Sequence, residues 1–159
     1  MIKKLFSSPS FLFLLAGNFY CIWYYENHPD AFATVVWIYW FQSITIGLFN
    51  FIDLLTIKNY TGDFKMNNQQ VTTGNKGCVA WFFLVHYGFF HLGYAVFLLI
   101  KLDLFTINKM VLLIGIATFF VEAGINFRRQ TQIEKTATIN MGTLFLLLYL
   151  RIVHMNLVI

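Results

Sequence analysis

Long stretches of apolar residues restrict what this sequence can fold into. All but the first approach or exceed the ~20 residues that an α-helix needs to cross about 30 Å of hydrocarbon. The stretches are continuously apolar rather than alternating, which favours helices over a β-barrel. Only 11% of the residues are charged, against about 25% in a typical soluble domain. We therefore predict an all-α, polytopic membrane protein built as a bundle of five transmembrane helices.

The predicted helices belong to one domain that spans residues 1–159. The first apolar stretch follows Met1-Ile-Lys-Lys and lacks a convincing cleavage site, so we interpret it as a retained helix and not as a signal peptide. A polar segment rich in Asn, Gln, Thr and Gly predicts a flexible cytoplasmic loop at residues 56–77. The five helices are expected at about residues 8–26, 31–55, 78–101, 108–127 and 137–159.

The positions of lysine and arginine predict how these helices are oriented. Outside the helices, eight basic residues fall on one side of the membrane and two, Lys101 and Lys109, fall on the other. Loops with an excess of Lys and Arg usually lie in the cytoplasm. The amino terminus is therefore expected inside and the carboxyl terminus outside. The eight residues are Lys3, Lys4, Lys58, Lys65, Lys76, Arg128, Arg129 and Lys135.

Polar and ionisable residues inside the predicted helices are the candidates for function. A charged side chain at mid-membrane costs about 2.5–3.5 kcal/mol even on the mildest scale, so such residues usually face the bundle interior and often mark a pathway or site. Several of them fall close to the expected centre of the membrane, with one histidine further out and one asparagine further in. These residues are Gln42, His86, His91, Glu122, Arg151, His154 and Asn50.

The three intramembrane histidines predict a metal or haem site formed by His86, His91 and His154. His86 and His91 are five residues apart, so their directions on a regular helix differ by about 140°. A widening of the helix near Gly88, two separate sites or a third ligand from His154 could still bring imidazoles together. Neutral imidazoles suit zinc, iron and copper, and haem takes axial histidines. Proton or substrate chemistry and structural hydrogen bonding remain open as alternatives.

A second group of polar residues is expected to support the histidines or to line a polar pathway. Glu122 and Asn126 are one turn apart and share a helix face. Glu122 is the central carboxylate available to Arg151, which could instead meet an anionic substrate or a haem propionate. Gln42 and Asn50 complete the group.

Small and polar residues also form a stripe in the second predicted helix. Ser43, Gly47 and Asn50 follow a spacing of three to four residues, which is more typical of a helix-packing seam than of a site. Asp53 is near the inner membrane boundary and is expected to be solvated.

Two further classes of function compete with a metal or haem protein. The same residues could line a small transporter or channel in which His86 or Glu122 relays protons, or the helices could serve a structural or assembly subunit. The sequence contains no HExxH motif, P-loop or nucleic-acid-binding module, so it leaves open whether the protein is an enzyme, and we expect no nucleic-acid partner. Expected partners are the lipid bilayer and either a second copy or another membrane protein.

Two segments of the chain resemble a known family. Trp40-Phe41-Gln42-Ser43, continuing to Gly47 and Asn50, together with His86-Tyr87-Gly88, is similar to a bacterial membrane-protein family catalogued as domain of unknown function 6498. The segment from Arg151 to Met155 is similar to its last helix. The resemblance implies a multi-pass protein of the bacterial cytoplasmic (inner) membrane and nominates His86, His91 and His154 without implying a reaction.

Overall fold

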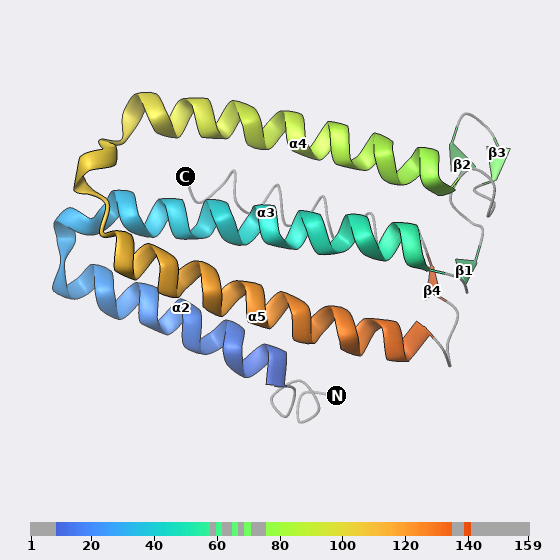
Figure 1. Ribbon diagram of the computed structural model, residues 1–159, viewed down its shortest axis with the longest axis horizontal. Coiled ribbons are helices and arrows are strands. Elements are labelled where there is room, and N and C mark those ends of the chain that lie inside the picture. The colour runs from blue at the N-terminus through green and yellow to red at the C-terminus, as the bar shows by residue number, and fades with distance from the viewer. Residues whose placement is uncertain are drawn as a thin grey trace.

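Four long helices make up most of the described chain in the computed structural model (Figure 1). They are α2 (Pro9–Asn27), α3 (Phe32–Thr56), α4 (Lys76–Lys101) and α5 (Lys109–Glu134). The short 3₁₀ helices η1 (Pro29–Ala31) and η2 (Leu104–Thr106) lie in the turns before α3 and α5. The structure describes residues 9–57, 60–61, 65–66, 69–70, 76–134 and 139–140.

Polar side chains shape the turn between α4 and α5. Asp103 Oδ1 accepts a hydrogen bond from the backbone N–H of Phe105 at 2.9 Å. Asn108 Oδ1 accepts from the backbone N–H groups of Met110 and Val111, both at 3.2 Å, and so satisfies two of the free donors at the start of α5. The backbone N–H of Asn108 in turn donates to Thr34 Oγ1 at 3.0 Å. This bond ties the start of α5 to the first turn of α3.

α3 is the central helix of the described part. Its most extensive contacts are with α5 on one side and α4 on the other, and α2 packs mainly against α5. Figure 1 shows the resulting order α4, α3, α5, α2 across the molecule. Polar residues on α3 can therefore face either of two helix interfaces.

Apolar side chains fill both sides of α3. Ile38 is fully buried in a cluster with Cys21 of α2 and Phe119 of α5, while Trp37 packs with Leu98 of α4. The fit against α5 depends on Gly115, where an added Cβ would lie 2.9 Å from the Ile38 side chain. Small residues that let helices approach closely are a common feature of membrane-helix interfaces.

Three described helical segments are long and apolar enough to cross a membrane, namely Pro29–Thr56, Lys76–Lys101 and Lys109–Ile133. Large apolar side chains on their outer surfaces are exposed, including Phe89 and Ile100 of α4, each 74% exposed. A surface of this kind is poorly suited to water but well suited to lipid acyl chains. The chain is therefore a multi-pass membrane protein surrounded by lipid.

The first four predicted helices agree closely in their bounds with α2, α3, α4 and α5, with one clear difference. α5 ends at Glu134 instead of residue 127. The prediction ended where the apolar run ended, but the polar residues that follow continue the helix. Thr131 Oγ1 donates to the Phe127 carbonyl oxygen at 3.0 Å, and Arg129 donates to Asn126 Oδ1 at 3.2 Å.

The remaining predictions concern the loop and the last helix. The expected loop at 56–77 contains β1 (Tyr60–Thr61), β2 (Lys65–Met66) and β3 (Gln69–Gln70), of which β2 and β3 pair antiparallel. Residues 139–140, which we predicted to lie in the helix at 137–159, instead form β4 (Ile139–Asn140) and pair in parallel with β1. Residues 141–159 lie outside the described residues, so the five-span count and the orientation stay predictions.

Candidate functional site

Three polar side chains meet between α3 and α4. Ser43 Oγ lies 2.8 Å from Tyr87 Oη and 2.8 Å from His91 Nε2. The Tyr87 hydroxyl donates to the Ser43 carbonyl oxygen at 2.7 Å. All three residues are only 5–6% exposed, and a buried polar group without a partner costs about 1–3 kcal/mol. The cluster Ser43–Tyr87–His91 therefore joins the two helices through groups that satisfy one another.

The contacts of His91 determine which ring nitrogen carries the proton in the neutral form. His91 Nδ1 lies 3.0 Å from the Tyr87 carbonyl oxygen. A carbonyl can only accept, so Nδ1 must be the protonated nitrogen, and Nε2 must accept from the Ser43 hydroxyl. The Tyr87 and His91 rings stack with centroids 4.1 Å apart, which further fixes the imidazole orientation.

Close approach of α3 and α4 at this point depends on Gly47, one turn after Ser43. A Cβ atom at residue 47 would lie 2.8 Å from Tyr87 Cδ1, which is closer than real Cβ contacts. Ser43 and Gly47 thus belong to a helix-packing seam, as their spacing predicts, whereas Asn50, the third residue of the predicted stripe, lines the cavity toward α5. Ser43 also takes part in the hydrogen-bonded cluster, which spacing alone did not indicate.

His86 makes different contacts from His91. Its ring is half-buried and stacks on the Phe82 ring, with centroids 5.6 Å apart. The Phe90 ring meets it edge-on, with centroids 5.1 Å apart. α4 is a continuous α-helix through Gly88, so a local widening does not bring the two imidazoles together. Because both nitrogens of His91 already have partners, metal binding there would have to displace the Ser43 hydroxyl.

The metal prediction depends on a residue beyond the described ones. Across the part of the chain that the structure describes, no group of three or more His, Cys, Asp or Glu residues is arranged to hold a metal ion. His154 and Arg151 lie outside the described residues. The three-histidine metal or haem site and the Glu122–Arg151 pair therefore stay predictions.

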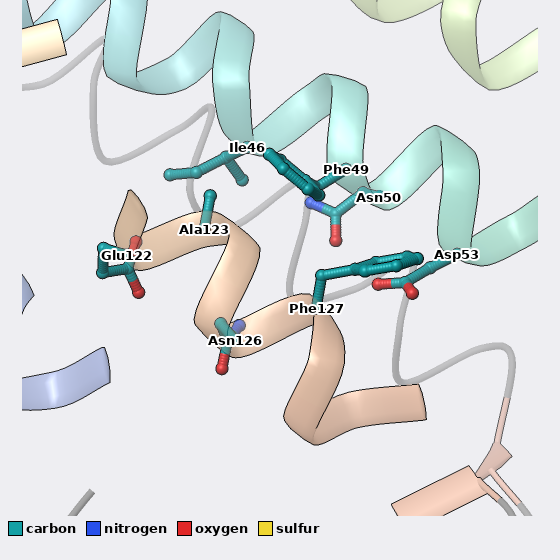
Figure 2. Close-up of a pocket in the computed structure, with 8 residues that line it drawn as sticks. All are labelled: Ile46, Phe49, Asn50, Asp53, Glu122, Ala123, Asn126 and Phe127. Atoms are coloured by element: carbon teal, nitrogen blue, oxygen red, sulfur yellow. The ribbon is translucent and has the colours of Figure 1, made fainter. Parts of the chain in front are cut away.

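A small polar cavity lies between α3 and α5, as Figure 2 shows. Its volume is about 30 Å³, above the roughly 10–15 Å³ of such space that one buried water molecule needs. Half of the residues that line it carry a side-chain oxygen. The lining residues are Ile46, Phe49, Asn50, Asp53, Glu122, Ala123, Asn126 and Phe127.

The cavity combines two carboxylates and two carboxamides in one helix interface. Asp53 and Glu122 are 6% and 9% exposed, and in the view of Figure 2 they lie at opposite ends of the cavity. Asn50 lies on the α3 side and Asn126 on the α5 side. Carboxylate and amide oxygens are the ligands of hard cations, and carboxylates also bind protons. The cavity can therefore receive a water molecule, a proton or a small cation.

Sequence reasoning identified part of each cluster. It nominated His91 as a metal or haem ligand, and this residue lies in the α3–α4 cluster. It nominated Asn50, Glu122 and Asn126 as supporting or pathway residues, and all three line the cavity. It was wrong about Asp53, which is buried in the interface with α5 instead of lying open to solvent at the membrane boundary.

Other side chains lie outside both clusters or were missed. Gln42 is half-buried, and it belongs neither to the Ser43–Tyr87–His91 cluster nor to the lining of the cavity. Tyr87 was overlooked, although its position four residues before His91 could have indicated a shared helix face.

Comparison with known proteins identifies the family but supplies no function. No curated protein and no solved structure matches this sequence. A family model matches residues 2–159. This match confirms the family resemblance noted for the segments that begin at Trp40 and His86. The chain therefore belongs to the family of unknown function DUF6498.

Proposed function

We propose that this protein is a small transporter or channel whose polar cavity between α3 and α5 handles protons or a small hard cation. The observation that carries this proposal is the gathering of Asn50, Asp53, Glu122 and Asn126 around one cavity between two apolar helices. Ionisable residues within membrane helices are costly and are retained mainly where they face a cavity or pathway.

The composition of the cavity supports a polar occupant. An empty cavity in a protein interior is normally lined by apolar groups and stays dry, whereas a water or ion needs several polar partners. Here two carboxylates and two amides line a space that also contacts the rings of Phe49 and Phe127. These two rings have centroids 5.6 Å apart and form an apolar border that would limit the size of a passing species.

We infer a bacterial cytoplasmic membrane as the location, with the amino terminus inside. The excess of Lys and Arg in the segments expected on one side supports this orientation. Glu122 and Asp53 would then act within a membrane that carries a proton gradient. Proton movement through the cavity is chemically consistent with that setting.

The proposal is tested by flux through proteoliposomes that contain the full-length protein. A pH-sensitive dye and a sodium-sensitive dye inside the vesicles report proton and cation entry separately. Glu122→Gln keeps the shape of the side chain but removes its proton-binding group. We expect it to slow proton flux about a hundredfold, the lower end of what a positioned acid–base group contributes.

Asp30→Asn is the matched control, because Asp30 is exposed and lies in η1, before α3 begins. The cavity residues of α3 start only at Ile46. This variant should conduct like the unmodified protein. Vesicles with correctly incorporated protein that are as tight as empty vesicles to both ions would contradict the proposal. Equal loss of flux in Asp30→Asn and Glu122→Gln would also contradict it.

A further inference from the structure

The Ser43–Tyr87–His91 cluster lies on the α4 side of α3, away from the cavity that faces α5. Its three side chains contain one imidazole and two hydroxyls joined by contacts of 2.8 Å. Hydroxyl groups both donate and accept hydrogen bonds, unlike carbonyls or ammonium groups. This property determines what the cluster can bind.

We infer that His91 is a reversible proton-binding site in which Ser43 and Tyr87 provide acceptors for the added proton. Its part in ion movement rests on the proposed function, whereas the binding of the proton itself does not. The ligand is a proton, and the atom that receives it is His91 Nε2.

The neutral form satisfies each of its donors. His91 Nδ1–H donates to the Tyr87 carbonyl at 3.0 Å, and the Ser43 hydroxyl donates to His91 Nε2 at 2.8 Å. The Tyr87 hydroxyl donates to the Ser43 carbonyl at 2.7 Å. The lone pair of Nε2, which accepts the Ser43 hydrogen bond, is the position that would take a further proton.

The charged form can satisfy each of its donors without movement of the heavier atoms. When Nε2 gains a proton, it becomes the donor and Ser43 Oγ the acceptor over the same 2.8 Å. The Ser43 hydroxyl hydrogen then rotates toward Tyr87 Oη, also 2.8 Å away. Tyr87 continues to donate to the Ser43 carbonyl. One hydroxyl rotation therefore accommodates the proton.

The surroundings of His91 compensate for part of the cost of a buried positive charge. The face of the Tyr87 ring stacks on the imidazole at a centroid distance of 4.1 Å and an interplanar angle of 21°, an arrangement that attracts a cation. Tyr87 is the titratable group that α4 presents to His91. α3 presents Ser43 and Trp40, and the Trp40 indole donates to the His91 carbonyl at 3.3 Å.

The chain contains a matched internal control in His28. Tyr24 and His28 have the same spacing as Tyr87 and His91, their rings stack at 4.7 Å, and His28 Nδ1 lies 3.3 Å from the Tyr24 carbonyl oxygen. His28 is exposed and lies at the end of α2, so it lacks the buried serine partner. A comparison of the two histidines separates the effects of burial and the Ser43 contact from those of the Tyr–His stack alone.

The test is ¹⁵N NMR of the histidine side chains in full-length protein in lipid nanodiscs, between about pH 5 and 9. His91→Gln and His28→Gln assign the two sets of signals. We expect His91 at high pH to show a single tautomer with bare Nε2, and at low pH a protonated Nε2 that exchanges slowly with water. His28, which is exposed to water, should show rapid exchange of its ring protons.

Ser43→Ala should keep the Nδ1–H tautomer, which the Tyr87 carbonyl fixes, but should abolish the slowly exchanging Nε2 proton while leaving the His28 signals unchanged. Tyr87→Phe provides a second variant, in which the Nε2 proton should exchange faster although Ser43 is retained. The inference is overturned if neutral His91 carries its proton on Nε2, or if Nε2 stays bare over the whole pH range. Covalent labelling of Ser43 by a fluorophosphonate would overturn it in favour of a nucleophile and base.

The outcomes separate this inference from the proposed function. Titration of His91 as described, in a protein that conducts no ions, would retain the proton site and reject the transporter. Ion flux that depends on Glu122, with a His91 that does not titrate, would retain the transporter and reject the proton site.

Discussion

The ring of Tyr87 on α4 fills the space beside Gly47 on α3, so the two helices can approach here only while residue 47 has no side chain. The same approach brings Tyr87 Oη to Ser43 and so assembles the buried cluster. Packing and hydrogen bonding between α3 and α4 are thus coupled at one turn of each helix.

Gly47→Ala is therefore expected to destabilise the protein by about 1–3 kcal/mol, as overpacking in a tight interface does. The measurement is the free energy of unfolding in detergent micelles. Gly88→Ala and Gly93→Ala on α4 are matched controls, because a Cβ at either position meets no described atom within 4 Å. The controls should leave stability unchanged or raise it by up to about 1 kcal/mol, as replacement of an unconstrained helical glycine does. A comparable loss in all three variants would reject the packing argument.

The hydrogen-bonded cluster should make a measurable contribution to stability. Ser43→Ala removes the partner of His91 Nε2 and Tyr87 Oη, and we expect a loss of about 1–3 kcal/mol. Tyr25→Phe is a control because this hydroxyl belongs to an exposed residue. A double-mutant cycle of Ser43→Ala with Tyr87→Phe should give a coupling of about 0.5–3 kcal/mol. Strict additivity of the two changes would mean that the hydroxyls do not interact.

Filling the cavity without removing a polar group should also block ion movement. Ala123 lines the cavity and is 6% exposed, so the three carbon atoms that Ala123→Leu adds are expected to fill it. We expect flux in proteoliposomes to fall to the level of empty vesicles. Ala117→Leu makes the same change at an exposed position of α5 and should conduct normally. Undiminished flux in Ala123→Leu would show that ions take another route.

The predicted metal or haem site has a direct chemical test. If His86, His91 and His154 hold zinc, iron, copper or haem, the purified protein should contain the metal or show a haem absorption band. His154→Ala should remove it. Elemental analysis and an absorption spectrum provide the measurement, with His28→Ala as a control at an exposed histidine. Absence of metal and haem after supplementation would reject the three-histidine site.

The two free cysteines report the predicted orientation. Cys78 is exposed near the start of α4, next to the segment predicted to be cytoplasmic, whereas Cys21 is buried. A membrane-impermeant maleimide should label Cys78 in inverted membrane vesicles and not in intact cells. Cys78→Ser should abolish the labelling, because Cys21 is inaccessible. Labelling of Cys78 in intact cells would reverse the predicted orientation.

The sequence was most informative where one physical constraint decides the structure. The helices expected at 31–55 and 78–101 agree closely with α3 and α4, because the thickness of the bilayer sets the length of an apolar run. The end of α5 and the strand β4 were missed, since neither depends on that constraint. Beyond Arg128, helix-forming polar residues continue α5 outside the apolar run.

Contacts between helices were harder to predict. The depth of Asn50, Glu122 and Asn126 could be counted from the helix ends, but the interface that each residue faces depends on which helices become neighbours. Asp53 was expected to be solvated because it lies near a helix end, and α5 buries it. Ser43 has no distinctive signal in the sequence until Tyr87 and His91 are opposite to it.

The central position of α3 also has a consequence for biosynthesis. The ribosome completes α3 before α4 and α5, yet these later helices supply its main contacts. Ser43 and Asp53 must therefore enter the membrane before their neighbours exist, and the insertion machinery or lipid headgroups have to accommodate them in the interval. A nascent chain that ends before α5 would lack the α5 side chains that line the cavity beside Asp53.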